Sequence, residues 1–445
     1  MTSTIGLSIL PEYESLAHDE RQGAFVVVLR PPPAPQERPP LRLVMALDAS
    51  GSMAGKKMET ALVSAKAVVK ALSSADSFAC VSFSGQAQVV LPMTTMNASG
   101  KQLAAQTIRG IKADGSTNLS DAILTSFELC QGKGHVLLLT DGCPTEGIAS
   151  PDQLEQLTRG AARGATLSAF GFGRDVNPLL LSSLAETGRG NYTFIEEGEP
   201  PLEAIAAEVG GLLMTSAANL KLVVRPLAGV TIQQVLRSRD ACLVDGLASL
   251  NLPALIAEEE VALPLVLRWD EAALGGTLAT LSVQAYDVAT GQLITAQASL
   301  TPCFTSTRGA LRSDAAREIL LGRSAVVLHQ ASQALSRSEH ELARDLAASH
   351  EELSAYARAA GIDGDPQVAA ALAMIQDAQQ GLLVVGDASR LARQDMVATS
   401  SALSKKRSTI TGVQAPSQMT SQKAFTSSSQ VLGVKLIKTM LDNDD

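Results

Sequence analysis

Between residues 41 and 215 the chain alternates short apolar runs with longer amphipathic stretches. Continuous apolar runs of about four to eight residues are typical of strands buried on both faces, as in parallel sheets covered by helices. The expected strands are residues 41–47, 78–83, 87–91, 135–140, 166–172 and 192–195. After the first strand, apolar residues recur at helical spacing from Met58 to Leu72, which predicts a helix with one buried face. We therefore expect a doubly wound α/β domain with a mostly parallel sheet over residues 40–215.

Further strands are expected on either side of this domain, and those within residues 216–305 have the alternating pattern of antiparallel strands. The expected strands are residues 7–10, 24–29, 220–224, 261–267, 277–286 and 292–300. Residues 216–305 predict an antiparallel β sandwich, whereas residues 1–36 supply two strands, which are not stable alone in water. We therefore expect residues 1–36 to pair with 216–305. The α/β domain would then be inserted into a discontinuous β domain.

A helical region is expected over residues 310–392. The predicted helices run from Asp314 to Leu335, from the capping box Ser338-x-x-Glu341, and from Asp365-Pro366 to Gly381. Residues 395–445 form a tail that is rich in Ser, Thr, Lys and Gln, a composition typical of disorder. Within the tail, residues 431–441 regain apolar side chains. This segment is either a short docking element for a partner or an apolar stretch without a role.

Composition excludes several classes of function. The 445 residues exceed what one core usually organises, and 46% of them are hydrophobic, so we expect two or three domains with sizeable cores. The net charge of −9 argues against binding to nucleic acid or to an anionic membrane surface. No apolar stretch has the length of a membrane span. The five cysteines have no paired spacing, and the N-terminus lacks a signal-peptide pattern, which favours a reducing cytoplasm.

Oxygen-bearing side chains follow two of the expected strands. Asp48, Ser50 and Ser52 follow the strand 41–47, and Asp141 follows the strand 135–140. Open α/β sheets bind ligands at the carboxyl ends of their strands. If residues 48–52 are extended, alternate side chains point the same way, so the carboxylate and the two hydroxyls converge. Hard oxygen donors without Cys or His suit Mg²⁺, and also Mn²⁺ or Ca²⁺.

These residues resemble the metal-ion-dependent adhesion site of von Willebrand factor type A domains. The matching residues are Asp48-x-Ser50-x-Ser52, Thr117 in Gly115-Ser116-Thr117-Asn118, and Asp141 in Thr140-Asp141-Gly142. The resemblance implies that the three hydroxyls contact the metal and that the two carboxylates act largely through bound water. It also implies that an acidic side chain from a protein partner fills the open coordination position. In some relatives, ligand binding shifts the last helix of the domain, which here is 202–213.

The whole-chain layout is similar to bacterial and plant proteins that carry this domain in the cytoplasm, and to inter-alpha-trypsin inhibitor heavy chains. Some relatives work with a separate ATPase, so an ATPase-containing complex is a further expected partner. This chain departs from the secreted members in having no signal peptide, and from the plant members in having no Cys/His zinc RING. These departures argue against extracellular adhesion and ubiquitin-ligase activity.

The same residues allow other interpretations. Asp48, Ser50 and Ser52 alone are equally typical of a turn before a helix. The loop 51–57 resembles a phosphate-binding loop, but it has three residues between its glycines, and Lys57 stands where such a loop needs Ser or Thr. Asp114 and Asp121 flank Thr117 and are expected to be solvated.

The sequence lacks the groups that hydrolytic chemistry requires. No Gly-x-Ser-x-Gly elbow is present. The five histidines are scattered, and His135 starts a strand at the end opposite the expected metal. Cys143 lies near the expected ion, as a redox-sensitive thiol or, more commonly, a buried apolar residue. The leading prediction is a non-enzymatic, Mg²⁺-dependent protein-interaction module. A nucleotide-hydrolysing or metal-dependent hydrolase, and a structural subunit with an architectural metal, remain as alternatives.

Overall fold

The computed structural model describes residues 4–33, 39–141, 144–173, 176–195, 201–236, 242–244, 246–252, 254–334, 337–383, 396–397 and 400. The chain divides into two compact units. One unit joins Met1–Gln36 with Thr215–Ser427, and the other contains Glu37–Met214. The expected docking segment 431–441, and the tail from 395 on except for residues 396–397 and 400, lie outside the described residues.

The second unit contains a six-stranded sheet in the order β6-β5-β4-β7-β8-β9. Its strands are β4 (Arg42–Asp48), β5 (Ser77–Phe83), β6 (Ala87–Thr95), β7 (His135–Thr140), β8 (Thr166–Phe172) and β9 (Arg189–Ile195). Only the edge strand β6 is antiparallel to its neighbour, and the other pairs are parallel. The expected doubly wound, mostly parallel sheet is therefore confirmed. Strand β4 lies inside the sheet between β5 and β7, so its carboxyl end has a neighbour on each side.

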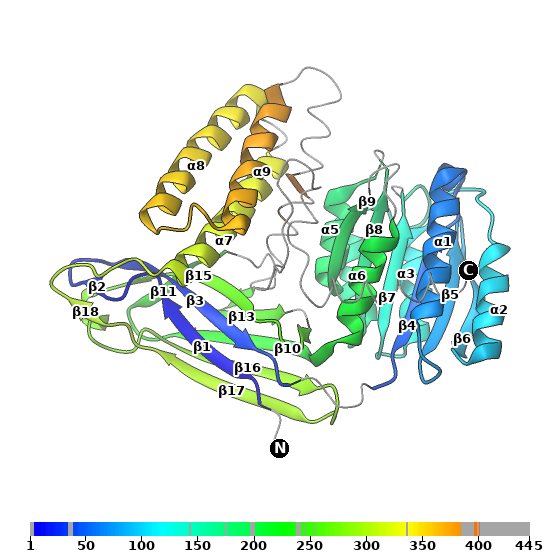
Figure 1. The fold of residues 1–445 in the computed structure, drawn as a ribbon, viewed down its shortest axis with the longest axis horizontal. Helices are drawn as coiled ribbons and strands as arrows, with labels where there is room; N and C mark the ends of the chain where they lie inside the picture. Colours follow the sequence, from blue (N-terminus) through cyan, green and yellow to red (C-terminus); the bar gives the residue numbers. More distant parts are fainter. Residues whose placement is uncertain are drawn as a thin grey trace. The chain divides into compact units, whose positions relative to one another are not determined.

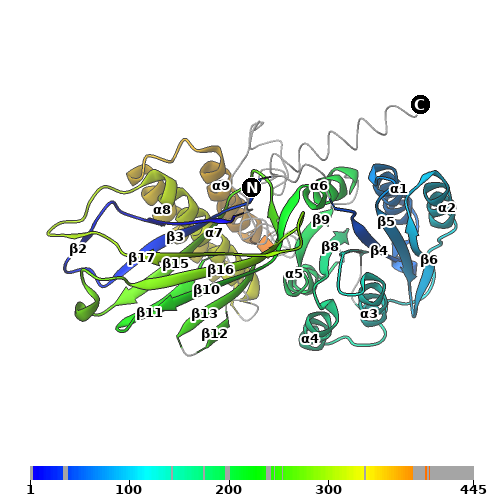
Figure 2. The same cartoon turned by 90° about the horizontal axis from the view of Figure 1, so that it is seen from below.

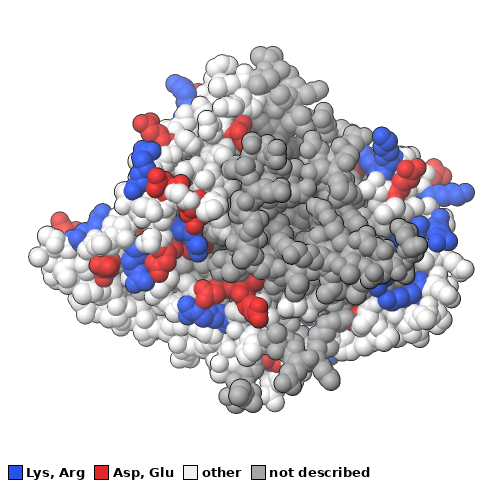
Figure 3. All heavy atoms as spheres, viewed as in Figure 1, with Lys and Arg blue, Asp and Glu red and all other residues white. Residues whose placement is uncertain are grey.

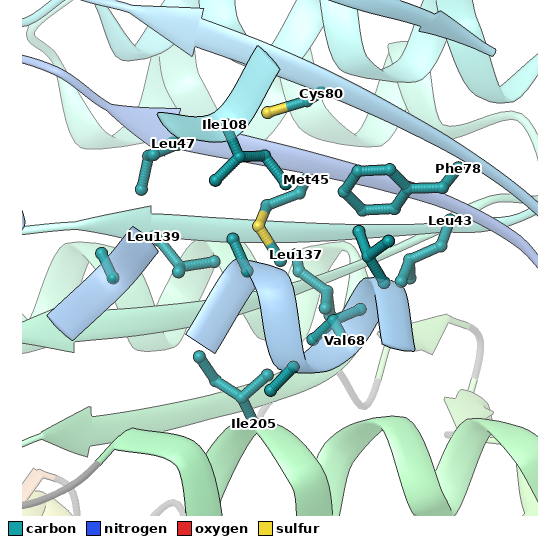
Figure 4. Close-up of a cluster of buried hydrophobic side chains, with 14 of the residues drawn as sticks. Leu43, Met45, Leu47, Val68, Phe78, Cys80, Ile108, Leu137, Leu139 and Ile205 are labelled. Carbon is teal, nitrogen blue, oxygen red and sulfur yellow. The ribbon is translucent and has the colours of Figure 1, made fainter. Parts of the chain in front are cut away.

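Helices cover both faces of this sheet (Figure 2). One face carries α1 (Lys56–Ala71), α2 (Ala98–Arg109) and α6 (Pro201–Leu213); the other carries α3 (Leu119–Cys130), α4 (Pro151–Ala162) and α5 (Pro178–Thr187). Figure 4 shows the core under the first group, where Met45 and Leu137 of the sheet lie with Val68 of α1 and Ile205 of α6. These side chains are at most 1% exposed, because the helices cover the apolar face of the sheet.

The first unit contains two packed antiparallel sheets (Figure 1). The first has the order β1-β3-β15-β11, and the second the order β12-β13-β10-β16-β17, with β14 paired to β10. The strands of the first are β1 (Gly6–Pro11), β3 (Gln22–Arg30), β15 (Val261–Trp269) and β11 (Val230–Val235). Those of the second are β12 (Cys242–Val244), β13 (Leu247–Leu252), β10 (Thr215–Pro226), β16 (Ala279–Asp287), β17 (Leu293–Leu300) and β14 (Leu255–Ile256). Two short strands, β2 (Leu16–Ala17) and β18 (Phe304–Thr305), pair in parallel beside them.

The N-terminal strands belong to this sandwich, as expected. Strand β3 pairs antiparallel with β15, so that Val27 lies opposite Leu263 although the two residues are more than two hundred positions apart in sequence. The chain leaves the sandwich after β3, builds the α/β unit, and returns at β10. Insertion of the α/β unit into a discontinuous β domain is therefore confirmed.

Strand β3 is buried on both faces, because the helical region packs on the outer face of its sheet. Phe25, Val27 and Leu29 lie in the core between the two sheets. The alternate residues Val26 and Val28 pack instead with residues of α7, which spans Ser313–Gln333. The helices therefore form one compact unit with the sandwich.

The remaining helices complete a three-helix bundle with α7. Helix α8 spans Glu339–Ala359 and α9 spans Pro366–Leu383. The Ser338–Glu341 capping box is present with both of its hydrogen bonds, as expected. The expected stop of the third helix at Gly381 is wrong, because α9 continues to Leu383. Burial of Leu382 in the bundle core outweighs the weak helix propensity of the preceding glycine.

The described surface carries both signs of charge. Figure 3 shows Lys and Arg interspersed with Asp and Glu on the face in view. In the described part of the chain, no helix is both long and apolar enough to cross a membrane.

Candidate metal centre

Asp48 ends β4 at the carboxyl edge of the sheet, and its side chain is fully buried. One carboxylate oxygen accepts a hydrogen bond from the Ser50 backbone N–H at 2.8 Å, and the other accepts one from the Thr140 hydroxyl at 2.5 Å. Burial raises the pKa of Asp48; hydrogen bonds from Thr140 and Ser50 lower it, and the Asp141 carboxylate raises it further. A cation beside Asp48 would oppose this rise by stabilising the charged form.

The loop after Asp48 brings two hydroxyls together, but not through an extended segment. Ser50 is extended, whereas Gly51–Met53 forms the short 3₁₀ helix η1. The expectation of an extended 48–52 is therefore wrong beyond Ser50. The turn is fixed because the Gly51 N–H donates to the Gly115 carbonyl at 3.0 Å and the Met53 N–H donates to the Ser50 carbonyl. The Ser50 and Ser52 hydroxyl oxygens still lie 3.1 Å apart.

Asp141 follows β7, and its side chain is 1% exposed. One of its carboxylate oxygens accepts a hydrogen bond from the Ser52 hydroxyl at 2.8 Å. Hydrogen bonds therefore link Asp48, Ser50, Ser52 and Asp141 in a continuous chain across the ends of two neighbouring strands. The structure brings these four predicted residues together.

Thr117 lies in the loop between α2 and α3 and is 3% exposed. Two backbone hydrogen bonds join this loop to the loop after β4, one of them from the Asp114 N–H to the Ala49 carbonyl at 2.7 Å. The Thr117 N–H donates to the Thr145 hydroxyl at 2.8 Å. For the Thr117 hydroxyl itself, no hydrogen bond is recorded within the described residues. The loop that carries Thr117 is therefore joined by its backbone to the loop after β4, and the Thr117 side chain is not part of the hydrogen-bond chain of the other four residues.

Lys57 is the residue that the sequence analysis missed. Its ammonium lies 2.5 Å from the second carboxylate oxygen of Asp141, and its side chain is 19% exposed. In the sequence, Lys57 only argues against a phosphate-binding loop. A signal was present nevertheless, because Lys57 lies five residues after Ser52, in the first turn of the next helix. Its contact with Asp141 spans more than eighty residues of sequence, so spacing alone does not reveal it.

Four further titratable residues were named from the sequence as candidates or alternatives for the site. Asp114 is exposed, as expected. The expectation that Asp121 is solvated is wrong. Its side chain is partly buried and accepts a hydrogen bond from the Ala87 N–H at 2.6 Å. His135 begins β7 at the opposite end of the strand from Asp141 and bonds the Thr166 hydroxyl. Cys143 lies outside the described residues.

The donor set suits a hard divalent cation. In the described part of the chain, no group of three or more His, Cys, Asp or Glu side chains is arranged to hold a metal ion. The candidate site instead has two carboxylates and three hydroxyls. Such a set is rich in neutral oxygens, and it fits Mg²⁺, which keeps several of its waters and binds few carboxylates directly. The buried Asp48 carboxylate favours a cation here, since buried charges are usually paired and Asp48 is hydrogen-bonded only by neutral groups, whereas Asp141 is paired with Lys57.

Comparison with known proteins identifies the α/β unit. Residues 41–194 match the family model of the von Willebrand factor type A domain. The chain therefore contains a von Willebrand factor type A domain, and domains of this family are typically protein-interaction modules.

Curated relatives share this part of the chain. The uncharacterized protein YfbK of Escherichia coli is 29% identical over 195 residues, which are 42% of this chain and 34% of that protein. Inter-alpha-trypsin inhibitor heavy chain H4 of Bos taurus is 31% identical over 198 residues, which are 40% of this chain and 21% of that protein. The chain thus matches about a third of the bacterial relative and about a fifth of the bovine one.

Solved structures share the fold over most of the chain. A von Willebrand factor type A protein from Catenulispora acidiphila aligns with a TM-score of 0.66 at 17% identity, covering 83% of this chain and 89% of that one. VWA2 from Sulfolobus acidocaldarius, a paralog of ArnB, aligns with a TM-score of 0.57 at 18% identity, covering 90% of this chain and 98% of that one. At these identities the likeness is one of fold.

Proposed function

We propose that this chain is a non-enzymatic protein-interaction protein whose α/β unit binds a partner through Mg²⁺. Asp48, Ser50, Ser52, Thr117 and Asp141 hold the ion, and one coordination position stays open for an acidic side chain of the partner. The observation that carries the proposal is that the buried carboxylates of Asp48 and Asp141 are linked through Ser50, whose backbone N–H donates to Asp48, and through the paired hydroxyls of Ser50 and Ser52. The family of the domain supports it.

The charge of this donor set explains why the ion would attract an acid. Two carboxylates that act largely through water leave the ion poorly neutralised by direct ligands. An anionic oxygen from a partner completes the coordination and supplies the missing charge. Hydrolysis would need, in addition, a base placed to activate a metal-bound water. His135 is the only histidine between residues 37 and 214, and it lies at the other end of β7, which disfavours that alternative.

Metal binding tests the first half of the proposal. Titration of the metal-free protein with Mg²⁺ in a calorimeter should show one site. Asp141→Ala should weaken this site about 10- to 100-fold, the usual effect of removing a group that orients metal-bound ligands. Asp114→Asn removes an exposed carboxylate beside the same loop, and should leave the dissociation constant within about twofold. Equal affinity in Asp141→Ala and the wild type would contradict the assignment.

Partner binding tests the second half. In a pull-down with the wild-type protein as bait, a partner should be retained in Mg²⁺ and lost in EDTA. The Asp141→Ala bait should fail to retain this partner even in Mg²⁺. Binding that persists in EDTA would favour an architectural metal instead. ATP hydrolysis by the purified protein, abolished in Asp48→Ala, would favour the enzyme alternative. In each case the variant must still unfold in a cooperative transition in EDTA, so that misfolding is not mistaken for loss of the site.

A further inference from the structure

Lys57 places a positive charge within the candidate metal centre itself. Its ammonium contacts one carboxylate oxygen of Asp141, while the Ser52 hydroxyl donates to the other. Both oxygens of this nearly inaccessible carboxylate are therefore engaged by groups of the protein. Under the proposed function, the same carboxylate has to accept hydrogen bonds from water bound to the metal.

The position of Lys57 is unfavourable unless Asp141 compensates for it. Lys57 lies in the first turn of α1, where the helix dipole disfavours a positive charge. Its stem passes close to Gly173 after β8, because a Cβ built on Gly173 would lie 3.0 Å from the Lys57 Cε. The neighbouring Lys56 is exposed and lacks an ion pair within the described residues. The contact with Asp141 is thus specific to Lys57 and is not a general property of this helix end.

The charges at the site show why the ammonium competes with a metal. Asp48 and Asp141 supply two negative charges, and Lys57 neutralises one of them. A divalent cation at the same site would meet a positive charge a few ångströms away in a partly buried environment, where repulsion between like charges is poorly screened.

We propose that Lys57 is a tethered cation that holds Asp141 in the metal-free protein and weakens divalent-cation binding. Entry of the metal moves the ammonium off Asp141. The inference rests on the proposed function, since it concerns the same ion. In this role, Lys57 sets the Mg²⁺ concentration at which the site fills. The site then fills at a higher Mg²⁺ concentration than its five oxygen donors alone would require.

Calorimetric titration of Lys57→Gln and Lys56→Gln with Mg²⁺ and with Mn²⁺ tests this role. Each variant removes one positive charge from the same turn of α1, but only the first frees Asp141. Lys57→Gln should bind both ions at least about fivefold more tightly than the wild type, and Lys56→Gln within about twofold. Lys57→Arg keeps the charge and should retain weak binding. Equal or weaker binding by Lys57→Gln, relative to Lys56→Gln, would overturn the inference.

Thermal unfolding supplies a readout that does not depend on a calorimetric signal. In EDTA, Lys57→Gln should unfold at a lower temperature than Lys56→Gln, because the buried Asp141 carboxylate loses its partner. In excess Mg²⁺ the increase in unfolding temperature should be larger for Lys57→Gln, since tighter binding stabilises the folded state more. An increase no larger than that of Lys56→Gln would contradict the proposed role.

The outcomes separate this inference from the proposed function. If the wild type binds Mg²⁺ and Lys57→Gln binds no more tightly, the inference fails while the proposed function stands. If neither the wild type nor any variant binds a divalent cation, the proposed function fails and the inference fails with it. Binding by Lys57→Gln at concentrations where the wild type takes up no metal would be the strongest support.

Discussion

At the scale of single residues, His135 shows how the fold changes the chemistry of a side chain. Partial burial lowers its pKa to about 4 from 6.5, and its Nδ1 lies 2.6 Å from the Thr166 hydroxyl oxygen. The unfolded chain therefore takes up a proton near pH 6.5, and the folded chain only near pH 4. Between these values the folded state binds fewer protons, so stability falls as the pH is lowered through this window.

The prediction is a loss of unfolding free energy between pH 6.5 and 4 that depends on His135. Urea unfolding of the α/β unit at a series of pH values should show a shallower decrease for His135→Gln than for the wild type. His340→Gln replaces an exposed histidine on α8 and should keep the wild-type slope. Identical slopes for wild type and His135→Gln would contradict the prediction.

At the scale of elements, two helical glycines that look alike in sequence have opposite surroundings. A Cβ at Gly322 in α7 would lie 2.9 Å from the Leu236 Cβ and 3.3 Å from the Pro264 Cγ. A Cβ at Gly160 in α4 would meet nothing within 4 Å. Alanine favours a helix by up to about 1 kcal/mol over glycine. At Gly160 an alanine would add this helix stability without a steric clash. At Gly322 the clash of the new Cβ with Leu236 and Pro264 would oppose the same gain.

We therefore expect Gly160→Ala to raise the unfolding free energy of the α/β unit by roughly 0.5–1 kcal/mol. Gly322→Ala should lower that of the other unit by about 1–3 kcal/mol, as overpacking does. Chemical denaturation of each variant measures both effects. Stabilisation by Gly322→Ala would mean that α7 does not pack tightly on the sheet.

At the scale of the whole molecule, the two compact units should respond differently to the metal. The chain has one tryptophan, Trp269, and it is 1% exposed in the core of the sandwich. Its fluorescence therefore reports on the unit that does not contain the candidate site. Ligand binding stabilises the unit that binds. We expect Mg²⁺ to leave the unfolding midpoint followed by Trp269 fluorescence unchanged. A separate transition, that of the α/β unit followed by circular dichroism, should shift to higher temperature.

Asp141→Ala is the control for this experiment, since it should remove the shift of the second transition and leave the first unaffected. A single transition, seen identically by fluorescence and circular dichroism and shifted as a whole by Mg²⁺, would contradict two independently unfolding units.

Local pattern predicted most of the elements, because strand and helix periods are properties of short segments. Strands β7 and β8 have the expected bounds, and the capping box at Ser338 is formed as expected. The errors lie where tertiary contacts outweigh local preference. Gly51–Met53 forms a turn because the Gly115 carbonyl accepts its N–H, and α9 continues past Gly381 because Leu382 is buried.

The sequence by itself determined the alternation of strands and helices, the carboxyl edge at which Asp48 and Asp141 lie, and the need of the N-terminal strands for a distant partner. Each follows from periodicity and from the rule that apolar faces must be buried. Only the tertiary structure decided that β3 pairs with β15, that α7 closes the outer face of β3, and that Lys57 reaches Asp141. These contacts join residues far apart in the chain, and their energy exists only once the fold has brought them together.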